Sequence, residues 1–368
     1  MSISLIDQKF MAATLRFSRW GMGLTSVNPC VGCLIVKDNV VVGKAITAFN
    51  GRPHAETQAL SEAGENAVGA TVYVSLEPCS HYGQVPPCAQ VLINAKVARV
   101  VVCIRDPDRR VSGRGLLMLS QAGIIVEEGI LQQEAYHVLD AYLIRQLKKR
   151  VHVTLKLAVS ADNMIGLRNV GNFPVTGDIA NAQSHIVRAH SDAILVGIGT
   201  ALIDDPELTC RLNGLESRSP IRIILDPRLE LPKTSKLVKT LSLSPVIVVT
   251  SSNNSKSIVD LEKEGINILY CNCYDIKKLL FMLVEHGITS LLVEGGAKVA
   301  HSFLKLDLVD TLILYKSKKI IGNQGIPSPI CIDKIEKTFE KIRCDSFGSD
   351  DCVEYSRRRQ CLQELLQI

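Results

Sequence analysis

The chain has 368 residues, of which 46% are hydrophobic and 21% are charged, and its formal net charge is +5. This length exceeds what one hydrophobic core usually organises, so we expect two domains, and the composition excludes a mainly disordered chain. The net charge is too small to favour a polyanionic partner such as a nucleic acid.

The sequence also argues against a membrane or secreted protein. It has no run of about 18 consecutive apolar residues, which a transmembrane helix needs. The first 20 residues lack the apolar stretch and cleavage site of a signal peptide and fit an amphipathic helix instead. The 12 cysteines do not have the spacing of a secreted disulfide framework. We therefore expect reduced thiols and a cytoplasmic location.

The first 150 residues alternate predicted strands and helices. A turn at residues 37–39 separates the first two strands, and Pro53 and Gly64 mark the start and the C-terminal cap of a helix. Strands are predicted at 30–36, 40–46, 70–76, 99–104 and 124–130, and helices at 54–64, 88–97, 115–123 and 131–147. This order indicates a layered α/β domain with a partly parallel sheet.

A second domain is expected after the basic run Lys148-Lys149-Arg150, which ends the helix predicted at 131–147. We place the boundary near residue 150, which gives domains 1–150 and 151–368. The same alternation continues, with strands predicted at 151–162, 193–198, 221–226, 246–250, 267–271, 290–296 and 310–322.

A zinc site is predicted from "PHAETQAL" and "VSLEPCSHYGQVPPC" in the first domain. His54, Cys79 and Cys88 provide the imidazole and thiolate ligands that zinc prefers, and three protein ligands leave a fourth position open for water. Glu56 lies two residues after His54 and is the expected proton shuttle. Zinc deaminases combine H-x-E with P-C-x-x-C, although eight residues stand between the cysteines here. We expect both cysteines at or near helix starts, which favour thiolates.

Alternatives to a catalytic zinc are a closed structural zinc site and two unrelated buried cysteines. His81, between the two cysteine ligands, is either a substrate contact or a surface histidine. Cys30 and Cys33 form a C-x-x-C at the start of a strand, where residues three apart point to opposite faces. We interpret them as core cysteines and not as a second metal or redox site.

Longer stretches resemble a known family. "NPCVGCLIVKD", "PHAETQAL", "VYVSLEPCSHYGQVPPC" and "DPDRRVSGRGLLMLSQAGI" resemble the deaminase half of the bifunctional riboflavin-biosynthesis enzymes. "KLAVSAD", "SDAILVGIGTALIDDPELTCR", "PIRIILD" and "LLVEGGAKVAHSF" resemble their reductase half, in the same order. The resemblance implies an N-terminal cytidine-deaminase-like α/β/α domain and a C-terminal dihydrofolate-reductase-like α/β domain.

The resemblance implies two reactions. The first domain would use zinc to hydrolyse the 2-amino group of 2,5-diamino-6-(5-phosphoribosylamino)pyrimidin-4-one, a phosphoribosylaminopyrimidine. The second would use NADPH to reduce the ribosyl chain, which gives 5-amino-6-(5-phosphoribitylamino)uracil. The resemblance also allows a homo-oligomer. A nucleic-acid-editing deaminase fits less well, because only 5% of the residues are aromatic, and such enzymes stack the flipped base on aromatic side chains. A zinc-stabilised scaffold without turnover is a further alternative.

Site residues follow from the resemblance, position by position. Without it, the glycine turn at Gly295 and Gly296, between a strand and a helix, is a weak indication of a phosphate site. Lys156 is a further candidate near the hydride. By the resemblance, the cofactor would contact Ala158, Pro174, Thr200, Asp204, Gly296, Ala297, Lys298, Val299, Ala300, His301 and Ser302. The substrates would contact Asn28, His81, Asn172, Arg188, Leu208, Arg211 and Glu294.

The chain departs from the family pattern at several positions. Gln84 stands where the family usually has a basic residue that meets the phosphate, and Thr47 replaces a histidine. In the second half Asn172 replaces a serine and Pro174 a tryptophan. A zinc deaminase with a degenerate, non-reducing second domain is therefore the alternative function.

Overall fold

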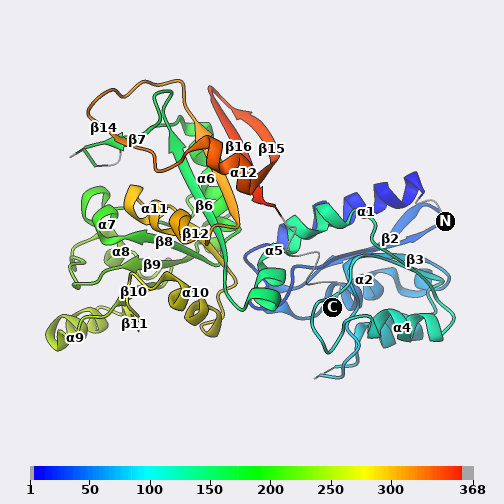
Figure 1. Cartoon of the computed structure of the whole chain (residues 1–368). Helices are drawn as coiled ribbons and strands as arrows, with labels where there is room; N and C mark the ends of the chain where they lie inside the picture. Colours follow the sequence, from blue (N-terminus) through cyan, green and yellow to red (C-terminus); the bar gives the residue numbers. More distant parts are fainter. Residues whose placement is uncertain (1–3, 84, 169, 172, 359–368) are drawn as a thin grey trace. The chain divides into compact units, whose positions relative to one another are not determined.

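The computed structural model describes residues 4–83, 85–168, 170–171 and 173–358. The chain divides into two compact units, Met1–Lys149 and Arg150–Ile368 (Figure 1). This division falls one residue before the boundary that we expected from the sequence. No helix among the described residues is long and apolar enough to cross a membrane.

The first unit is built on one five-stranded mixed sheet with the order β2-β1-β3-β4-β5. Strand β1 pairs antiparallel with β2 and β3, while β3, β4 and β5 are parallel. All five predicted strands are present, and the turn between the first two consists of Asp38 and Asn39, both with positive φ. The bounds are β1 (Gly32–Lys37), β2 (Val40–Ile46), β3 (Thr71–Leu76), β4 (Arg99–Ile104) and β5 (Ile125–Glu128).

Helices cover both faces of this sheet, as Figure 1 shows. α1 (Leu5–Ser18) and α5 (Gln132–Lys148) pack on one face, and α2 (Ala55–Ala63), α3 (Cys88–Asn94) and α4 (Arg114–Gln121) belong to the other layer. Short 3-10 helices are η1 (Arg19–Gly21), η2 (Phe49–Gly51) and η3 (Gly64–Ala67).

Helix α2 lies unusually close to β2, and this positions the residues at the start of the helix. A Cβ on Gly43 would stand 2.2 Å from the carbonyl oxygen of Ala59, so a side chain at position 43 would push the helix away. Gly64 ends the helix with a positive φ, as its predicted C-cap role requires. His54 is the N-cap residue, so it precedes the helix and does not lie inside it.

The second unit contains a nine-stranded sheet with the order β11-β10-β9-β8-β12-β6-β13-β16-β15. Strands from β11 to β13 are parallel, and β12 returns late in the chain to insert between β8 and β6. The bounds are β6 (His152–Val159), β8 (Ala193–Gly197), β9 (Ile221–Leu225), β10 (Val246–Thr250), β11 (Asn267–Tyr270), β12 (Ser290–Val293), β13 (Thr311–Lys316), β15 (Phe339–Phe347) and β16 (Asp350–Arg357).

Two features of the second unit were not predicted. The antiparallel hairpin of β15 and β16 extends one edge, and β7 (Met164–Leu167) pairs with β14 (Gly325–Pro327) in a separate small sheet. The helices are α6 (Asp178–Ala189), α7 (Ile198–Asp204), α8 (Lys236–Lys239), α9 (Ser255–Lys263), α10 (Ile276–Glu285), α11 (Ala297–Lys305), α12 (Ile332–Thr338) and the 3-10 helix η4 (Glu216–Arg218).

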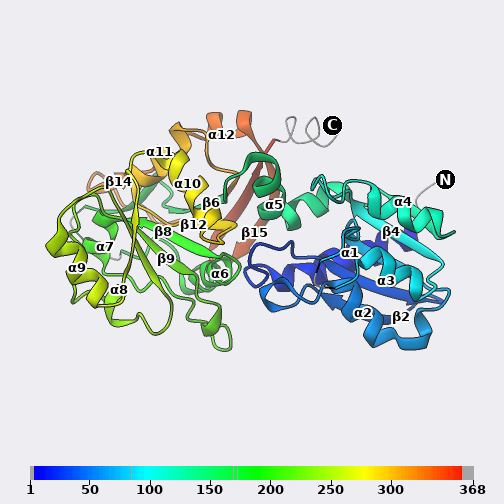
Figure 2. The same ribbon diagram turned by 90° about the horizontal axis from the view of Figure 1, so that it is seen from below.

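The large sheet has an apolar core on each face. Helices α10, α11 and α12 cover one face, and α6, α8 and α9 lie on the other (Figure 2). Leu155, Leu157 and Val159 of β6 point into the first core. Side chains alternate along a strand, so Lys156 and Ala158 face α6 instead.

Candidate active sites

Three potential zinc ligands converge in the first unit from three separate elements. His54 precedes α2, Cys79 follows β3 and Cys88 is the first residue of α3. The Nδ1 atom of His54 is 3.3 Å from the Sγ atom of Cys88 and 3.7 Å from that of Cys79. All three donor atoms lie within 4.8 Å of one another, and no other metal-binding group of this kind occurs among the described residues.

The loop that carries Cys79 is anchored by Glu77, a residue that our sequence analysis missed. Glu77 is 3% exposed, and its carboxylate binds backbone groups of a neighbouring loop. It accepts hydrogen bonds from the backbone N–H groups of Asp106, Gly113, Gly115 and Leu116. The expectation of a helix start at Cys79 was wrong, because residues 77–80 form an irregular segment. Cys88 does begin a helix, as expected.

The charges of the three ligands fit a zinc site. Hydrogen bonds with Cys88 and His54 lower the pKa of Cys79 to about 4, which favours the thiolate. The hydrogen bond to Cys79 and burial raise the pKa of Cys88, so metal binding has to displace this proton. The hydrogen bond with Cys79 raises the pKa of His54. Two sulfurs and one imidazole nitrogen match the donor set of catalytic zinc.

Glu56 lies beside these ligands in the first turn of α2. It lines the same pocket as His54 and Cys79, and the residue is only 3% exposed. Burial raises the pKa of Glu56 to about 7. A carboxyl group with such a pKa can accept and release a proton near neutrality, which suits general acid–base catalysis.

The ligands and Glu56 line a pocket that also contains the two candidate substrate contacts, Asn28 and His81. The Nδ1 atom of His81 is buried and has no hydrogen-bond partner among the described residues. Asn28 is held against the backbone of Gly51, where any Cβ would overlap the Asn28 amide. Both residues therefore lie where a ligand in the pocket could reach them.

Asp106 and Tyr142 also line this pocket, and sequence reasoning missed both. The hydroxyl of Tyr142 donates a 2.9 Å hydrogen bond to Asp106. Burial raises the pKa of Asp106 to about 6. Asp106 could have been found, because it lies two residues after the end of a buried strand beside the one that leads to Cys79. Tyr142 gave no such signal, because it lies in the middle of an amphipathic helix.

Two of the departures noted in the sequence fall in this region. Thr47 has a structural role: its Oγ1 donates to the carbonyl of Pro29 and accepts from the N–H of Val31, each at 2.9 Å. Gln84 lies outside the described residues. Cys30 and Cys33 are buried, form no disulfide and lie outside the ligand cluster, as expected of core cysteines.

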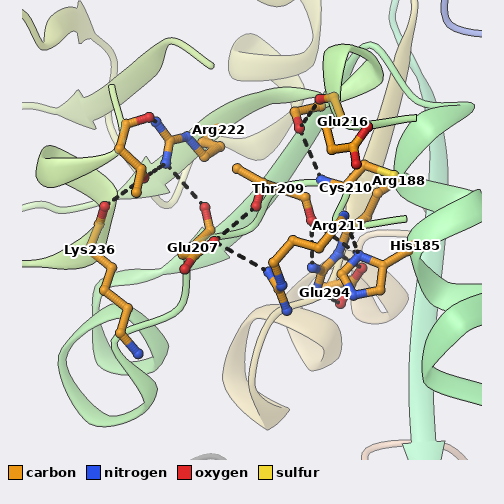
Figure 3. Close-up of polar contacts among 12 residues, drawn as sticks. His185, Arg188, Glu207, Thr209, Cys210, Arg211, Glu216, Arg222, Lys236 and Glu294 are labelled. Carbon is orange, nitrogen blue, oxygen red and sulfur yellow. Dashed lines mark hydrogen bonds and ion pairs between the residues drawn. The ribbon is translucent and has the colours of Figure 1, made fainter. Parts of the chain in front are cut away.

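In the second unit, Arg188 of α6 pairs with Glu294, which directly follows β12 (Figure 3). The pair is bidentate, with Nε to Oε1 and Nη2 to Oε2 both at 2.9 Å. The two side chains are 13% and 11% exposed. Burial alone would raise the pKa of Glu294, but the charges of Arg188 and Lys156 outweigh it and lower this pKa to about 2.

Lys156 is close to this pair on the α6-facing side of β6. Its ammonium group lies 5.4 Å from the centre of the Tyr315 ring. Burial and the charge of Arg188 lower the pKa of Lys156, while Glu294 opposes the shift. A lysine whose pKa is lowered releases its proton more readily, so this position can act as an acid.

The segment from Asp205 to Arg211 borders the Arg188–Glu294 pair and carries two predicted substrate contacts. The carbonyl of Thr209 accepts a 3.1 Å hydrogen bond from Nη1 of Arg188. Arg211 is exposed and lies 3.8 Å from Glu207. Leu208 has a positive φ and a buried side chain that packs in the core, so its backbone is the part that a ligand could meet.

Arg222 of β9 contacts this segment at Glu207 (Figure 3). Its guanidinium is fully buried and donates to the carbonyl of Glu207 at 3.1 Å, to Oγ1 and the carbonyl of Thr240, and to the carbonyl of Ser244. Arg222 therefore couples the substrate segment to the strand and to the turn before β10.

We expect Arg222→Met to lower the free energy of unfolding by about 3 kcal/mol, because buried carbonyls lose their donors. The reductase KM for the pyrimidine substrate should rise, since the segment from Asp205 to Arg211 loses its support. Urea unfolding and steady-state kinetics measure the two effects. Arg222→Lys should fall between wild type and Arg222→Met, and an unchanged KM in the Met variant would contradict the positioning role.

The glycine turn after β12 leads directly into α11. Gly296 is the N-cap residue, and its N–H donates to Oγ1 of Thr200 at 3.2 Å. Thr200 lies inside α7. The open N–H groups at the start of α11 fit a phosphate site, whereas Ala300 is buried in the core and offers only its backbone.

The remaining predicted cofactor contacts are spread over several elements. Asp204 is the last residue of α7, Ala158 is on the α6-facing side of β6, and Pro174 is an exposed loop residue. Asn172 lies outside the described residues. Ala297, Lys298, Val299, His301 and Ser302 are all in α11, where His301 and Lys298 are exposed.

Comparison with known proteins shows the family to which the chain belongs. Residues 5–104 match the family model of the cytidine and deoxycytidylate deaminase zinc-binding region, and residues 151–353 match that of the RibD C-terminal domain. The riboflavin biosynthesis protein RibD of Aquifex aeolicus is 35% identical over 354 residues, which cover 96% of this chain and 99% of that protein. The chain belongs to the RibD family.

Solved structures agree with membership of the RibD family. RibD of Acinetobacter baumannii has a TM-score of 0.84 at 32% identity, over 96% of this chain and 99% of that chain. A Thermotoga maritima structure described as a diaminohydroxyphosphoribosylaminopyrimidine deaminase/5-amino-6-(5-phosphoribosylamino)uracil reductase has a TM-score of 0.85 at 31% identity, with the same coverage. RibD of Escherichia coli is 36% identical over 364 residues, which cover 94% of this chain and 98% of that protein.

Membership of the RibD family confirms the main expectations from the sequence. The first domain is of the cytidine-deaminase type and the second is a RibD reductase domain with a dihydrofolate-reductase-like fold. The chain is a bifunctional deaminase and reductase of riboflavin biosynthesis. Its cofactors are zinc in the first domain and NADPH in the second.

Proposed function

We propose that the chain deaminates 2,5-diamino-6-(5-phosphoribosylamino)pyrimidin-4-one and then reduces the ribosyl chain of the product to ribityl. The observation that carries this proposal is the presence of two sites with complementary chemistry. The cluster of His54, Cys79 and Cys88 has a buried glutamate beside it, and the Arg188–Glu294 pair stands at the end of a parallel strand. Relatives and neighbours with the matching names support the substrate.

In the first site, each residue has a distinct task. His54, Cys79 and Cys88 hold zinc, which when bound supplies the Lewis acidity that makes water nucleophilic at neutral pH. Glu56 accepts the proton of the attacking water and delivers it to the leaving nitrogen, which departs as ammonia. Asn28 and His81 orient the pyrimidine, and Asp106 with Tyr142 offers a further polar contact on the same wall.

In the second site, the chain positions the substrate and the cofactor. NADPH supplies the hydride for the ribosyl carbon, and the open N–H groups at the start of α11 bind its phosphates. Arg188 and Glu294 bind the substrate as one preorganised unit. Lys156 donates the proton that accompanies the hydride, because its pKa is lowered and it lies near the pair.

The predicted contacts with the cofactor are part of this proposal. Thr200, Asp204 and the segment from Gly296 to Ser302 border one end of β8 and β12, next to Glu294. We also propose a cytoplasmic location, since no cysteine among the described residues forms a disulfide.

A coupled assay tests the proposal. Purified, zinc-loaded protein is incubated with the diaminopyrimidinone ribotide, with and without NADPH. We expect ammonia release in both cases and stoichiometric NADPH oxidation when the cofactor is present. Ammonia release without NADPH oxidation would support the alternative of a non-reducing second domain, and neither signal from folded protein would reject the proposed function.

A further inference from the structure

Three arginines line the deaminase pocket, and they differ in what they contact. Arg145 donates to the carbonyl of Val27 at 2.7 Å, and Arg110 forms a 2.6 Å ion pair with Asp108. Arg52 makes no hydrogen bond or ion pair within the described part of the chain, and it is exposed. Its five N–H donors are therefore available to a ligand.

Arg52 is placed between the zinc ligands and the loop that joins Cys79 to Cys88. It precedes His54 by two residues. An atom at the Cβ position of Gly83 would stand 3.8 Å from Nη2 of Arg52, which is ordinary van der Waals contact. The guanidinium thus lies against the residue that precedes Gln84, where the family pattern usually has its basic side chain.

The local charge balance leaves Arg52 as a net positive group. A zinc ion with two thiolates and one neutral imidazole sums to zero, and the Asp108–Arg110 pair is neutral as well. Three further carboxylic acids line the pocket: Glu77, which accepts hydrogen bonds from backbone N–H groups, and Glu56 and Asp106, which are buried. Within the described part of the chain, Arg52 forms an ion pair with none of these acids, so its guanidinium is available to an anion in the pocket.

His81 lines the same pocket. The buried Nδ1 atom of His81 has no partner among the described residues. His81 and Arg52 belong to different segments, yet both lie beside the cluster of His54 and Cys79. An arginine with free donors next to an unpartnered imidazole nitrogen is an arrangement that suits a phosphate monoester, because a guanidinium binds phosphate with two parallel hydrogen bonds.

We propose that Arg52 is the phosphate-binding residue of the deaminase pocket and binds the ribosyl phosphate of the substrate. It would take the role of the basic side chain that the family usually has at position 84, where this chain has glutamine. This inference rests on the proposed function, since that substrate carries the phosphate. Arg52 positions the substrate and takes no part in proton transfer, which remains with Glu56.

Kinetics with two substrates test this role. Ammonia release is measured for the ribotide and for its dephosphorylated nucleoside, with wild type and with Arg52→Met. The variant should raise the KM for the ribotide about 10- to 100-fold, the range of a charge-assisted hydrogen bond, with little change in kcat or in the nucleoside KM. An equal loss for both substrates overturns the proposal, because it would show a structural role.

Arg109→Met is the matched control, since Arg109 is exposed in a neighbouring loop and does not line the pocket. It should leave both KM values unchanged. Arg52→Lys keeps a point charge without the planar fork and should recover part of the ribotide affinity.

A binding measurement separates this inference from the proposed function. Hydrogen–deuterium exchange of the zinc-loaded protein is followed with and without ribose 5-phosphate. Residues 49–60 and 79–90 should be protected in wild type and not in Arg52→Met, whatever base the enzyme deaminates. Equal protection in both proteins, or none in either, would overturn the phosphate site, whereas normal protection without ammonia release would reject only the proposed deamination.

Discussion

Glu56→Gln is expected to abolish ammonia release while the second domain continues to reduce the deaminated intermediate. The amide keeps the size of the side chain but cannot carry the proton from water to the leaving nitrogen. Loss of such a shuttle lowers the rate about 10²- to 10⁴-fold. Ammonia release from the ribotide and NADPH oxidation with the deaminated intermediate measure the two activities separately.

Zinc content decides how this result is interpreted. Glu56 is not among the three grouped ligands, so the variant should bind one zinc ion per chain, as measured by atomic absorption. Glu62→Gln is the control, because Glu62 lies on the same helix and only accepts a hydrogen bond from the N–H of Lys44. Retained deamination in Glu56→Gln would show that another group moves the proton.

The deaminase site could be predicted from the sequence because its residues lie close together in the chain. His54, Glu56, Cys79 and Cys88 span 35 positions and are attached to the starts of helices or the end of a strand. Their spacing alone therefore indicated both the ligand set and the proton shuttle. What the sequence did not predict is the support of the site, such as the way Glu77 binds four backbone N–H groups of residues 106–116.

The reductase site was harder to predict because its members are far apart in the chain. Arg188 and Glu294 are 106 positions apart, and they meet only because β12 inserts between β8 and β6. No local pattern predicts that insertion. The resemblance supplied both residues, but neither their bidentate pairing nor the fully buried Arg222 that contacts the neighbouring segment could be inferred from the sequence.

The hairpin of β15 and β16 at the edge of the large sheet was not predicted from the sequence, for a different reason. Phe339 is the only buried residue of strand β15, Ile342 is half-buried, and the strand carries several charged side chains. Such a strand lacks the apolar alternation on which strand prediction depends. Pairing with β16 overrides this weak local preference.

Arg188→Met is expected to lower the reductase kcat/KM about 10²- to 10³-fold and to leave ammonia release unchanged. Removing one partner of a buried ion pair costs about 3–5 kcal/mol, because the other charge stays buried and unpaired. The substrate also loses a preorganised donor. NADPH oxidation with the deaminated intermediate measures the effect. Arg228→Met is the control: it removes an arginine from another pair with glutamate, but Arg228 is 77% exposed, so the loss should be small.

The pH dependence of stability provides a second and independent test of the same pair. The folded-state pKa of Glu294 is about 2, below that of a glutamate in an unfolded chain, about 4.3. The ionised carboxylate therefore stabilises the fold fully above about pH 4.3, and this contribution is lost as the pH falls towards 2. In Arg188→Met the main lowering charge is gone and burial should raise the pKa. The difference in unfolding free energy between wild type and variant should therefore shrink below about pH 4.3, and a difference that does not vary with pH would mean that Arg188 does not control the charge of Glu294.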